Sequence, residues 1–323
     1  MDCTNLKKIT IPKSVSYISI FAFNGCESLT DINVNDLSTW CNMSYGDYFF
    51  RNIFNNWSLY LNGQLVSELS IPSNVTKISR GIFADCKSLR KVTIPQNVRT
   101  IDDNAFYKCD NITNVTISNG VEEIGEFAFN GCNNLTDITI PPSITSIKKD
   151  AFIGCKGTLT IYSNIPHDAF TNTYFSKVII ENGVTEIGGN AFNNCTELRN
   201  VTLSNSVTYI GHNAFAYCEG LSNITIPNSV TYIAHEAFLG CTGLSSITIP
   251  KNVEIIEQGI FYDCDNLTCI YCKPTTPPTC YGRIFSEKNI DNLKIYVPES
   301  AVQAYKIASG WGHYADKIYA APN

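Results

Sequence analysis

The chain has 323 residues, of which 44% are hydrophobic and 16% are charged, and its formal net charge is −6. This negative balance argues against nucleic acid or an anionic membrane as partner, because both attract a basic protein face. No segment reaches the roughly 18 uninterrupted apolar residues of a spanning helix. The first residues also lack a basic stretch followed by an apolar run, so no signal peptide is visible.

The dominant feature is an internal repeat, marked by a phenylalanine at most steps of 22 to 24 residues. The strongest consensus is L-x-x-I-x-I-P-x-x-V-x-x-I-x-x-x-A-F-x-x-C, and the units 206–228 and 229–251 are identical at 16 of 23 positions. About twelve coils are predicted from the marker residues, which are Phe23, Phe54, Phe83, Phe106, Phe129, Phe152, Phe170, Phe192, Phe215, Phe238, Phe261 and Phe285.

Each coil contains two short extended segments and has no room for a crossover helix. The first segment, as in LSNITIP, alternates β-branched residues and stops at a proline, which cannot continue a ladder. One coil cannot bury its apolar residues alone, so neighbouring coils must stack. The sequence predicts a single domain over 1–323: a right-handed, β-rich solenoid with parallel ladders about 4.8 Å apart and little helix.

At the N-terminus, Cys3 stands at the cysteine position of the repeat, so the chain begins inside a coil. We therefore expect that upstream residues, including a signal sequence, are missing. A strand containing Leu6, Ile9 and Ile11 would then have an uncovered edge, open to contact with another chain.

The region 35–66 is predicted to be an irregular insertion, because 60 residues separate Phe23 from Phe83. Asp36 can cap a short helix, and Asn62-Gly63 is a type I′ hairpin signal.

Further along, only 18 residues separate Phe152 from Phe170, so that coil should lack most of its second extended segment. Residues 286–323 are predicted to form a C-terminal cap, with one last strand in LKIYV and a helix at 299–309 that covers the open end of the solenoid.

Ten of the fourteen cysteines share one column of the repeat, three residues after the phenylalanine. Parallel, in-register side chains do not point at one another, so we expect a ladder of buried thiols and not a set of disulfides. Near the C-terminal end, Cys264, Cys269, Cys272 and Cys280 superficially resemble a zinc site, and a Cys272–Cys280 bridge is an alternative. Because Cys269 and Cys272 fall on a predicted strand, no metal is assigned.

The outward column of the second ladder contains three large residues in succession, Tyr209, Tyr232 and Ile255, where the other coils from Lys77 onward have small or charged residues; Tyr17 is the one other large residue in this column. His212 and His235 stand alongside, in a column shared with His167. Two histidines without a third strong ligand make a weak metal site, so none is assigned. The predicted binding strip consists of Tyr209, Tyr232, Ile255, His212 and His235, although packing between coils explains the same residues.

The serial LxxIxIPxxVxxIxxxAFxxC units resemble the 23-residue leucine-rich repeats of BspA-like bacterial surface antigens. This resemblance implies a secreted or surface-attached, non-enzymatic adhesion protein that binds a host or neighbouring-cell protein or glycan. A structural spacer for a missing N-terminal module is the alternative. A hydrolytic enzyme is disfavoured because no catalytic motif is visible, and no cofactor is expected.

Overall fold

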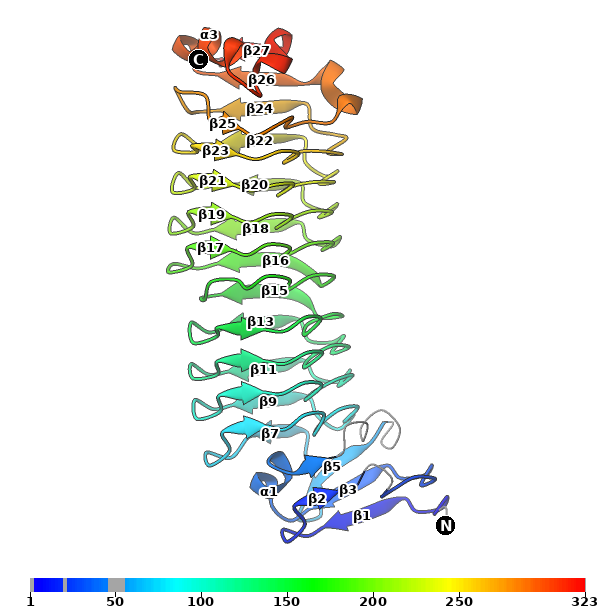
Figure 1. Cartoon of the computed structure of the whole chain (residues 1–323). Coiled ribbons are helices and arrows are strands. Elements are labelled where there is room, and N and C mark those ends of the chain that lie inside the picture. The colour runs from blue at the N-terminus through cyan, green and yellow to red at the C-terminus, as the bar shows by residue number, and fades with distance from the viewer. Residues whose placement is uncertain (1–2, 20–21, 46–55, 323) are drawn as a thin grey trace. The chain divides into compact units, whose positions relative to one another are not determined.

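The computed structural model describes residues 3–19, 22–45 and 56–322. The chain divides into two compact units, Met1–Gly157 and Thr158–Asn323. Each unit is a stack of parallel β-coils, and together they contain about 13 turns with little helix (Figure 1). The prediction of a β-solenoid is therefore confirmed, whereas its description as a single domain stays a prediction.

In the first unit, the longer strands form two groups that hydrogen-bond in parallel, except for the antiparallel β6. The first group contains β1 (Lys8–Ile11), β3 (Asp31–Val34), β5 (Ser58–Leu61) and β6 (Gln64–Leu65), and the second contains β7 (Glu68–Ser70), β9 (Lys91–Ile94), β11 (Asn114–Ile117) and β13 (Asp137–Ile140). The two-residue strands of the other ladder are β2 (Tyr17–Ile18), β4 (Ser44–Tyr45), β8 (Lys77–Ile78), β10 (Thr100–Ile101), β12 (Glu123–Ile124) and β14 (Ser146–Ile147). β15 (Lys156–Ile161) follows at the boundary between the units.

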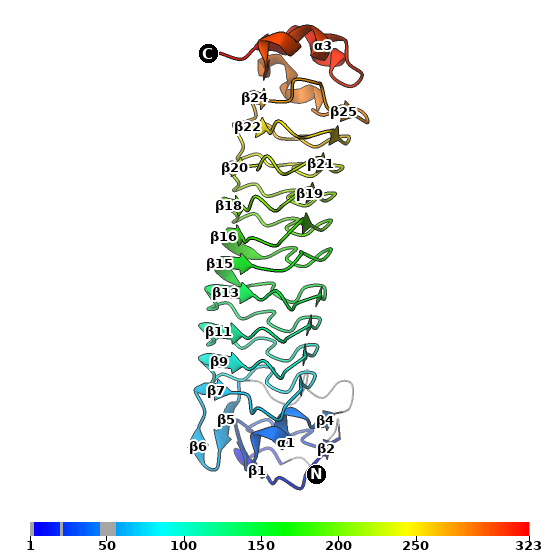
Figure 2. The ribbon, with the colours of Figure 1, turned by 90° about the vertical axis from the view of Figure 1, so that its left-hand side faces the viewer.

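The second unit repeats this arrangement. Its longer strands are β16 (Tyr174–Ile180), β18 (Asn200–Leu203), β20 (Asn223–Thr225), β22 (Ser246–Ile249), β24 (Cys269–Cys272), β26 (Lys294–Val297) and β27 (Ile318–Ala320). Its two-residue strands are β17 (Glu186–Ile187), β19 (Tyr209–Ile210), β21 (Tyr232–Ile233), β23 (Ile255–Ile256) and β25 (Thr279–Cys280). Figure 2 shows the two ladders of this unit on opposite sides of the coils.

The repeat phenylalanines fill the space between the ladders. Phe106, Phe129 and Phe152 are fully buried, and the centroids of successive rings lie 5.3 and 5.4 Å apart in stacked geometry. The same stacking runs through the second unit from Phe170 to Phe285. Each ring is therefore packed between its neighbours, which explains why the coils cannot fold separately.

The insertion has the local features that its sequence predicts. α1 (Leu37–Cys41) is capped by Asp36, whose Oδ1 accepts the backbone N–H of Thr39 at 2.7 Å. β5 and β6 form an antiparallel hairpin in which Asn62 and Gly63 have φ of 49° and 83°, as a type I′ turn requires. Residues 46–55, including Phe54, lie outside the described residues.

The short coil between Phe152 and Phe170 also follows the prediction. In place of a two-residue strand, its second extended segment has a single bridge, from Ile165 to Ile187.

The C-terminal cap contains the predicted helix and one strand more than predicted. After β26, the chain forms the 3-10 turn η2 (Glu299–Ala301), α3 (Val302–Ile307) and the 3-10 segment η3 (Gly312–Lys317), and then returns to the ladder as β27. A further 3-10 segment, η1 (Glu287–Asn292), precedes β26. The expectation of one last strand was wrong, because Ile318–Ala320 pairs in parallel with β26 after the helix.

Side chains from this cap are fixed against the preceding coil. Trp311 Nε1 donates to the carbonyl of Pro278 at 2.9 Å, and the hydroxyl of Tyr305 donates to the carbonyl of Pro274 at 3.1 Å. At the other end, β1 is the outer strand of its group, with Leu6 and Ile9 partly exposed. Contact of a second chain at that edge stays a prediction.

Candidate binding surface

The predicted strip of large side chains is assembled on the short ladder of the second unit. Tyr209 pairs with Tyr232, and Tyr232 pairs with Ile255, in parallel register. The two tyrosine rings have centroids 5.4 Å apart and are tilted by 40°. All three side chains are partly exposed, so the strip presents ring edges and an isoleucine to solvent.

A carboxylate that the sequence analysis did not single out holds this strip in place. Glu257, two residues after Ile255, accepts the hydroxyl of Tyr232 through Oε1 and the backbone N–H of His235 at 2.7 Å through Oε2. Its hydrogen bond raises the pKa of Tyr232 to about 12. Burial and the nearby Glu257 and Glu186 carboxylates also raise the pKa of Tyr209. Both phenols are therefore protonated at neutral pH.

In the histidine column, His212 and His235 lie on adjacent coils, where the backbone N–H of Asn213 donates to the carbonyl of His235 at 2.9 Å. The ring of His212 contacts that of His167, two coils away, with centroids 5.4 Å apart. This contact is possible because Gly189 occupies the position between them. A Cβ placed on Gly189 would lie 2.1 Å from Cε1 of His212. His235 turns towards Glu236, whose Oε1 lies 3.2 Å from its Nε2.

Nine of the ten cysteines of the repeat column are buried, which confirms that part of the prediction, whereas Cys3 is exposed. The structure adds a reason for cysteine at this position. From Cys109 to Cys264, the thiol donates to the carbonyl of the phenylalanine in the preceding coil, as Cys132 does to Phe106 at 3.2 Å. Burial raises the pKa of Cys86 to about 11 and that of Cys264 to about 12. Cys86 and Cys264 are therefore poor nucleophiles, and the buried column serves the packing of the turn.

The cysteines after this column belong to β24 and β25. Cys269 and Cys272 lie on β24, as predicted, and Cys280 lies on β25; all three are thiols. Over residues 3–19, 22–45 and 56–322, no group of three or more His, Cys, Asp or Glu side chains is placed to hold a metal ion.

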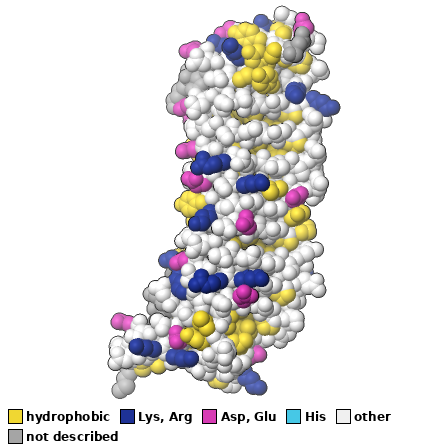
Figure 3. Space-filling model, turned by 180° about the vertical axis from the view of Figure 1, so that it is seen from behind, with side chains coloured by type: hydrophobic (Ala, Val, Ile, Leu, Met, Phe, Trp, Pro, Cys, Tyr) yellow, Lys and Arg dark blue, Asp and Glu magenta, His cyan; other side chains and the backbone are white. Residues whose placement is uncertain are grey.

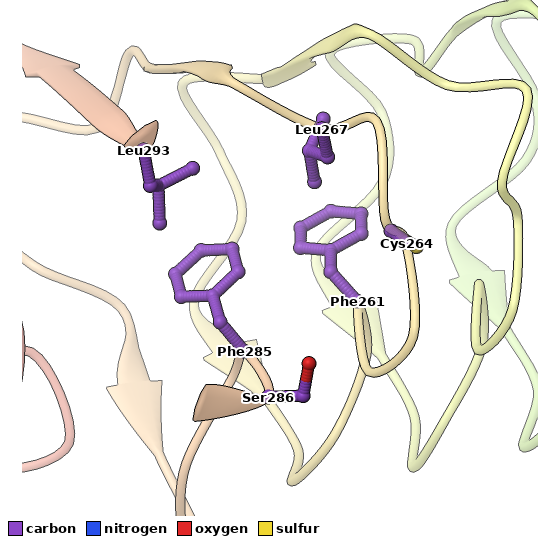
Figure 4. A pocket seen from close by; sticks show the side chains of 6 residues that line it. All are labelled: Phe261, Cys264, Leu267, Phe285, Ser286 and Leu293. Carbon is purple, nitrogen blue, oxygen red and sulfur yellow. The ribbon is translucent and has the colours of Figure 1, made fainter. Parts of the chain in front are cut away.

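One apolar pocket lies between two coils of the second unit (Figure 4). It is lined by Phe261, Cys264, Leu267, Phe285, Ser286 and Leu293. The buried hydroxyl of Ser286 has no hydrogen-bond partner among the described residues. The lining offers no second ionisable group beside the Cys264 thiol, so this pocket is a packing defect of the core and not a site for acid–base chemistry.

A second row of tyrosines lies on the long ladder, and the sequence analysis missed it. Tyr271 of β24, Tyr296 of β26 and Tyr319 of β27 are in parallel register. The signal was present as three segments in which isoleucine and tyrosine precede a small apolar residue, at 270–272, 295–297 and 318–320. It was overlooked because the last two segments lie outside the repeat consensus and β27 was not expected.

The stacked coils, the two parallel ladders and the surface files of equivalent side chains define a leucine-rich-repeat solenoid. The family model described as a BspA-type leucine-rich repeat region with 6 copies matches residues 1–67, 58–164 and 163–291. The chain belongs to this family. Among curated proteins, the search found no match to this chain.

The solved structure of one similar protein supports the fold. A leucine-rich repeat protein from Bacteroides ovatus aligns with a TM-score of 0.56 and 22% identity, over 92% of this chain and 85% of that one. A leucine-rich cell surface protein from Faecalibacterium prausnitzii aligns with a TM-score of 0.40 and 25% identity, over 83% and 79% of the two chains. The pneumococcal vaccine antigen PcpA aligns with a TM-score of 0.43 and 17% identity, over 98% and 80%.

Proposed function

We propose that this chain is a non-enzymatic binding protein, secreted or held at a bacterial cell surface, and that the strip of Tyr209, Tyr232 and Ile255 contacts its partner. Membership of the BspA-type family and the cell-surface description of the Faecalibacterium prausnitzii protein support the location and the general role. In the described part of the chain, no helix is long and apolar enough to cross a membrane.

The observation that carries the proposal is the arrangement of the strip. Three successive coils place large side chains in register on a ladder whose equivalent residues in the first unit are Lys77, Thr100, Glu123 and Ser146. Tyrosine provides a large contact area at a low cost in conformational entropy, and it is enriched at the centres of protein interfaces. Because Glu257 fixes the Tyr232 hydroxyl, the strip is already ordered before it meets a partner. The expected partner is a host extracellular-matrix or surface protein or glycan.

The same hydrogen bond favours a second candidate function, that of a structural spacer. A phenol fixed to its neighbouring coil contributes to packing whether or not a ligand exists. In this alternative, the ladders hold a further module away from the cell, and the strip binds nothing.

Binding of the full chain to immobilised fibronectin, fibrinogen and a glycan panel tests the proposal. Replacing Tyr209 and Tyr232 together by Ser should abolish binding to whichever partner is found. The matched control is the pair Thr100→Ser and Glu123→Ser, which changes the equivalent ladder of the first unit and should leave binding intact. If the tyrosine pair lowers thermal stability while binding persists, the strip serves packing alone. If no partner binds the unmodified chain above background, the spacer is favoured.

A further inference from the structure

Tyr271, Tyr296 and Tyr319, named here the C-terminal tyrosine ladder, form a continuous row of rings. The centroids of Tyr271 and Tyr296 lie 5.3 Å apart with planes 19° from parallel, and those of Tyr296 and Tyr319 lie 6.2 Å apart at 47°. In the coil before β24, the equivalent residue is Thr248. The file is threonine at Thr202, Thr225 and Thr248, so three successive tyrosines are a local change at its C-terminal end.

The row is exposed, and the stacking decides which atoms a ligand can reach. Tyr271 is 37% exposed and Tyr319 is 45% exposed. Because neighbouring rings cover much of each other's faces, the row offers ring edges and phenol hydroxyls. The side chain of the neighbouring Cys269 raises the pKa of Tyr271. A phenol hydroxyl can both donate and accept hydrogen bonds. Such a surface suits a polar ligand rich in hydrogen-bonding groups better than an apolar side chain.

Lysines border the ladder on both sides. Lys294 precedes Tyr296 by two residues and therefore lies on the same face of the sheet, and Lys273 follows Tyr271 by two. Both are exposed, and neither forms an ion pair within the described part of the chain. Lys317 is partly neutralised by Asp316, whose Oδ2 lies 3.3 Å from its Nζ, and it also donates to the carbonyl of Asp291 at 3.4 Å.

Figure 3 views the face of the long strands and shows hydrophobic side chains gathered near the C-terminal end of the second unit, with both basic and acidic side chains close by. In a chain of net charge −6, this border of lysines is a local region where an anion is attracted. The lysines therefore give the C-terminal tyrosine ladder a preference for negatively charged ligands that the phenol hydroxyls alone would not have.

The repeat of the row indicates the kind of polymer that fits along it. An extended peptide presents side chains on one face every 6.6 to 6.8 Å, roughly, which is longer than both the 5.3 Å step from Tyr271 to Tyr296 and the 6.2 Å step from Tyr296 to Tyr319. A linear glycan with equatorial linkages advances by a length close to the first of these steps at each sugar and presents hydroxyls along its length. Carboxylates on those sugars would face the lysines.

We propose that the C-terminal tyrosine ladder, with Lys273 and Lys294, binds a linear acidic polysaccharide that carries uronic-acid carboxylates and runs from coil to coil. The phenols donate to the carboxylates and exchange hydrogen bonds with the sugar hydroxyls, and the lysines select for negative charge. This site is independent of the Tyr209–Tyr232 strip, which lies on the other ladder.

Calorimetric titration of the full chain with a β-1,4-linked oligoglucuronate hexasaccharide, whose linkages are equatorial, tests this site. The neutral control ligand is a cello-oligosaccharide of equal length. The unmodified chain should prefer the acidic ligand, and its affinity should fall as added salt shortens the Debye length. The triple variant Tyr271→Phe, Tyr296→Phe and Tyr319→Phe keeps the stacked rings and removes the hydroxyls, so binding should weaken by about tenfold or more while the melting temperature stays unchanged.

The double variant Lys273→Gln and Lys294→Gln should weaken acidic-ligand binding by about threefold and remove the preference over the neutral ligand. The matched control, Tyr209→Phe with Tyr232→Phe, changes the other tyrosine pair and should leave oligoglucuronate binding unchanged. The proposal is overturned if the hexasaccharide does not bind, if the triple variant binds as well as the unmodified chain, or if the ladder tyrosines are needed for a protein partner instead. A loss confined to the Tyr209–Tyr232 variant would place glycan binding on the other strip.

Discussion

Replacing Phe129 with Ala tests whether the stacked phenylalanines couple one coil to the next. The side chain is fully buried, and its ring centroid lies 5.3 Å from that of Phe106 and 5.4 Å from that of Phe152. Truncating a buried Phe to Ala costs about 3 to 5 kcal/mol, and the cost rises when the surroundings cannot collapse into the cavity. Here rings border the cavity on both sides and belong to coils whose ladders fix their spacing. We therefore expect a loss near the upper end, about 5 kcal/mol.

Because the stability of a repeat protein is approximately a sum over neighbouring units, the loss should be local. Hydrogen exchange on the full chain should show the largest fall in protection in β11 to β14, and urea unfolding followed by circular dichroism should become broader or biphasic. Thr116→Ala provides a matched control, because this residue lies on the exposed face of the same coil and its loss should cost under about 0.5 kcal/mol. A loss under about 2 kcal/mol for Phe129→Ala, or an equal loss for the control, would refute the idea that the ring stack couples the coils.

Three further outcomes are expected. Without reductant, most of the fourteen cysteines should react with a thiol reagent in denatured protein, whereas the buried repeat-column thiols should stay unreacted in native protein. Detection of fewer than half of the column cysteines in the denatured protein would contradict the thiol ladder. Glu257 raises the pKa of Tyr232 to about 12, so the stability that their hydrogen bond contributes is complete below the ordinary pKa of 10 and is lost as the pH rises towards 12. The difference in melting temperature between the unmodified chain and Tyr232→Phe, followed against pH, measures this contribution. A constant difference from pH 9 to 12 would argue against the hydrogen bond. Gly157→Ala should destabilise the chain far more than Gly63→Ala. Both glycines have positive φ, but only at Gly157 would a Cβ meet backbone, because it would lie 1.6 Å from the carbonyl oxygen of Thr136. Equal melting temperatures for the two variants would show that this close approach does not exist.

Features that depend on local sequence could be predicted without the structure. The spacing of Phe106 and Phe129 gave the coil length because each coil must place its ring over the one before. Asp36 and Asn62-Gly63 predicted a capped helix and a hairpin because capping and positive φ are properties of a few neighbouring residues. The in-register approach of Tyr209 and Tyr232 followed from the same period, since equivalent positions of parallel coils become neighbours.

Contacts that depend on the space left by neighbouring side chains, or on the path of the chain outside the repeat, were decided only by the tertiary structure. The period puts His167, His212 and His235 in one column, and the missing side chain at Gly189 lets the ring of His212 reach that of His167, two coils away. Glu257 became part of the tyrosine strip only when the turn after β23 brought its carboxylate to Tyr232. Tyr319 joined the C-terminal tyrosine ladder because the cap returns to the sheet after α3, a path that no repeat period contains. A period determines which residues are equivalent, whereas the space left by neighbouring side chains determines which of them meet.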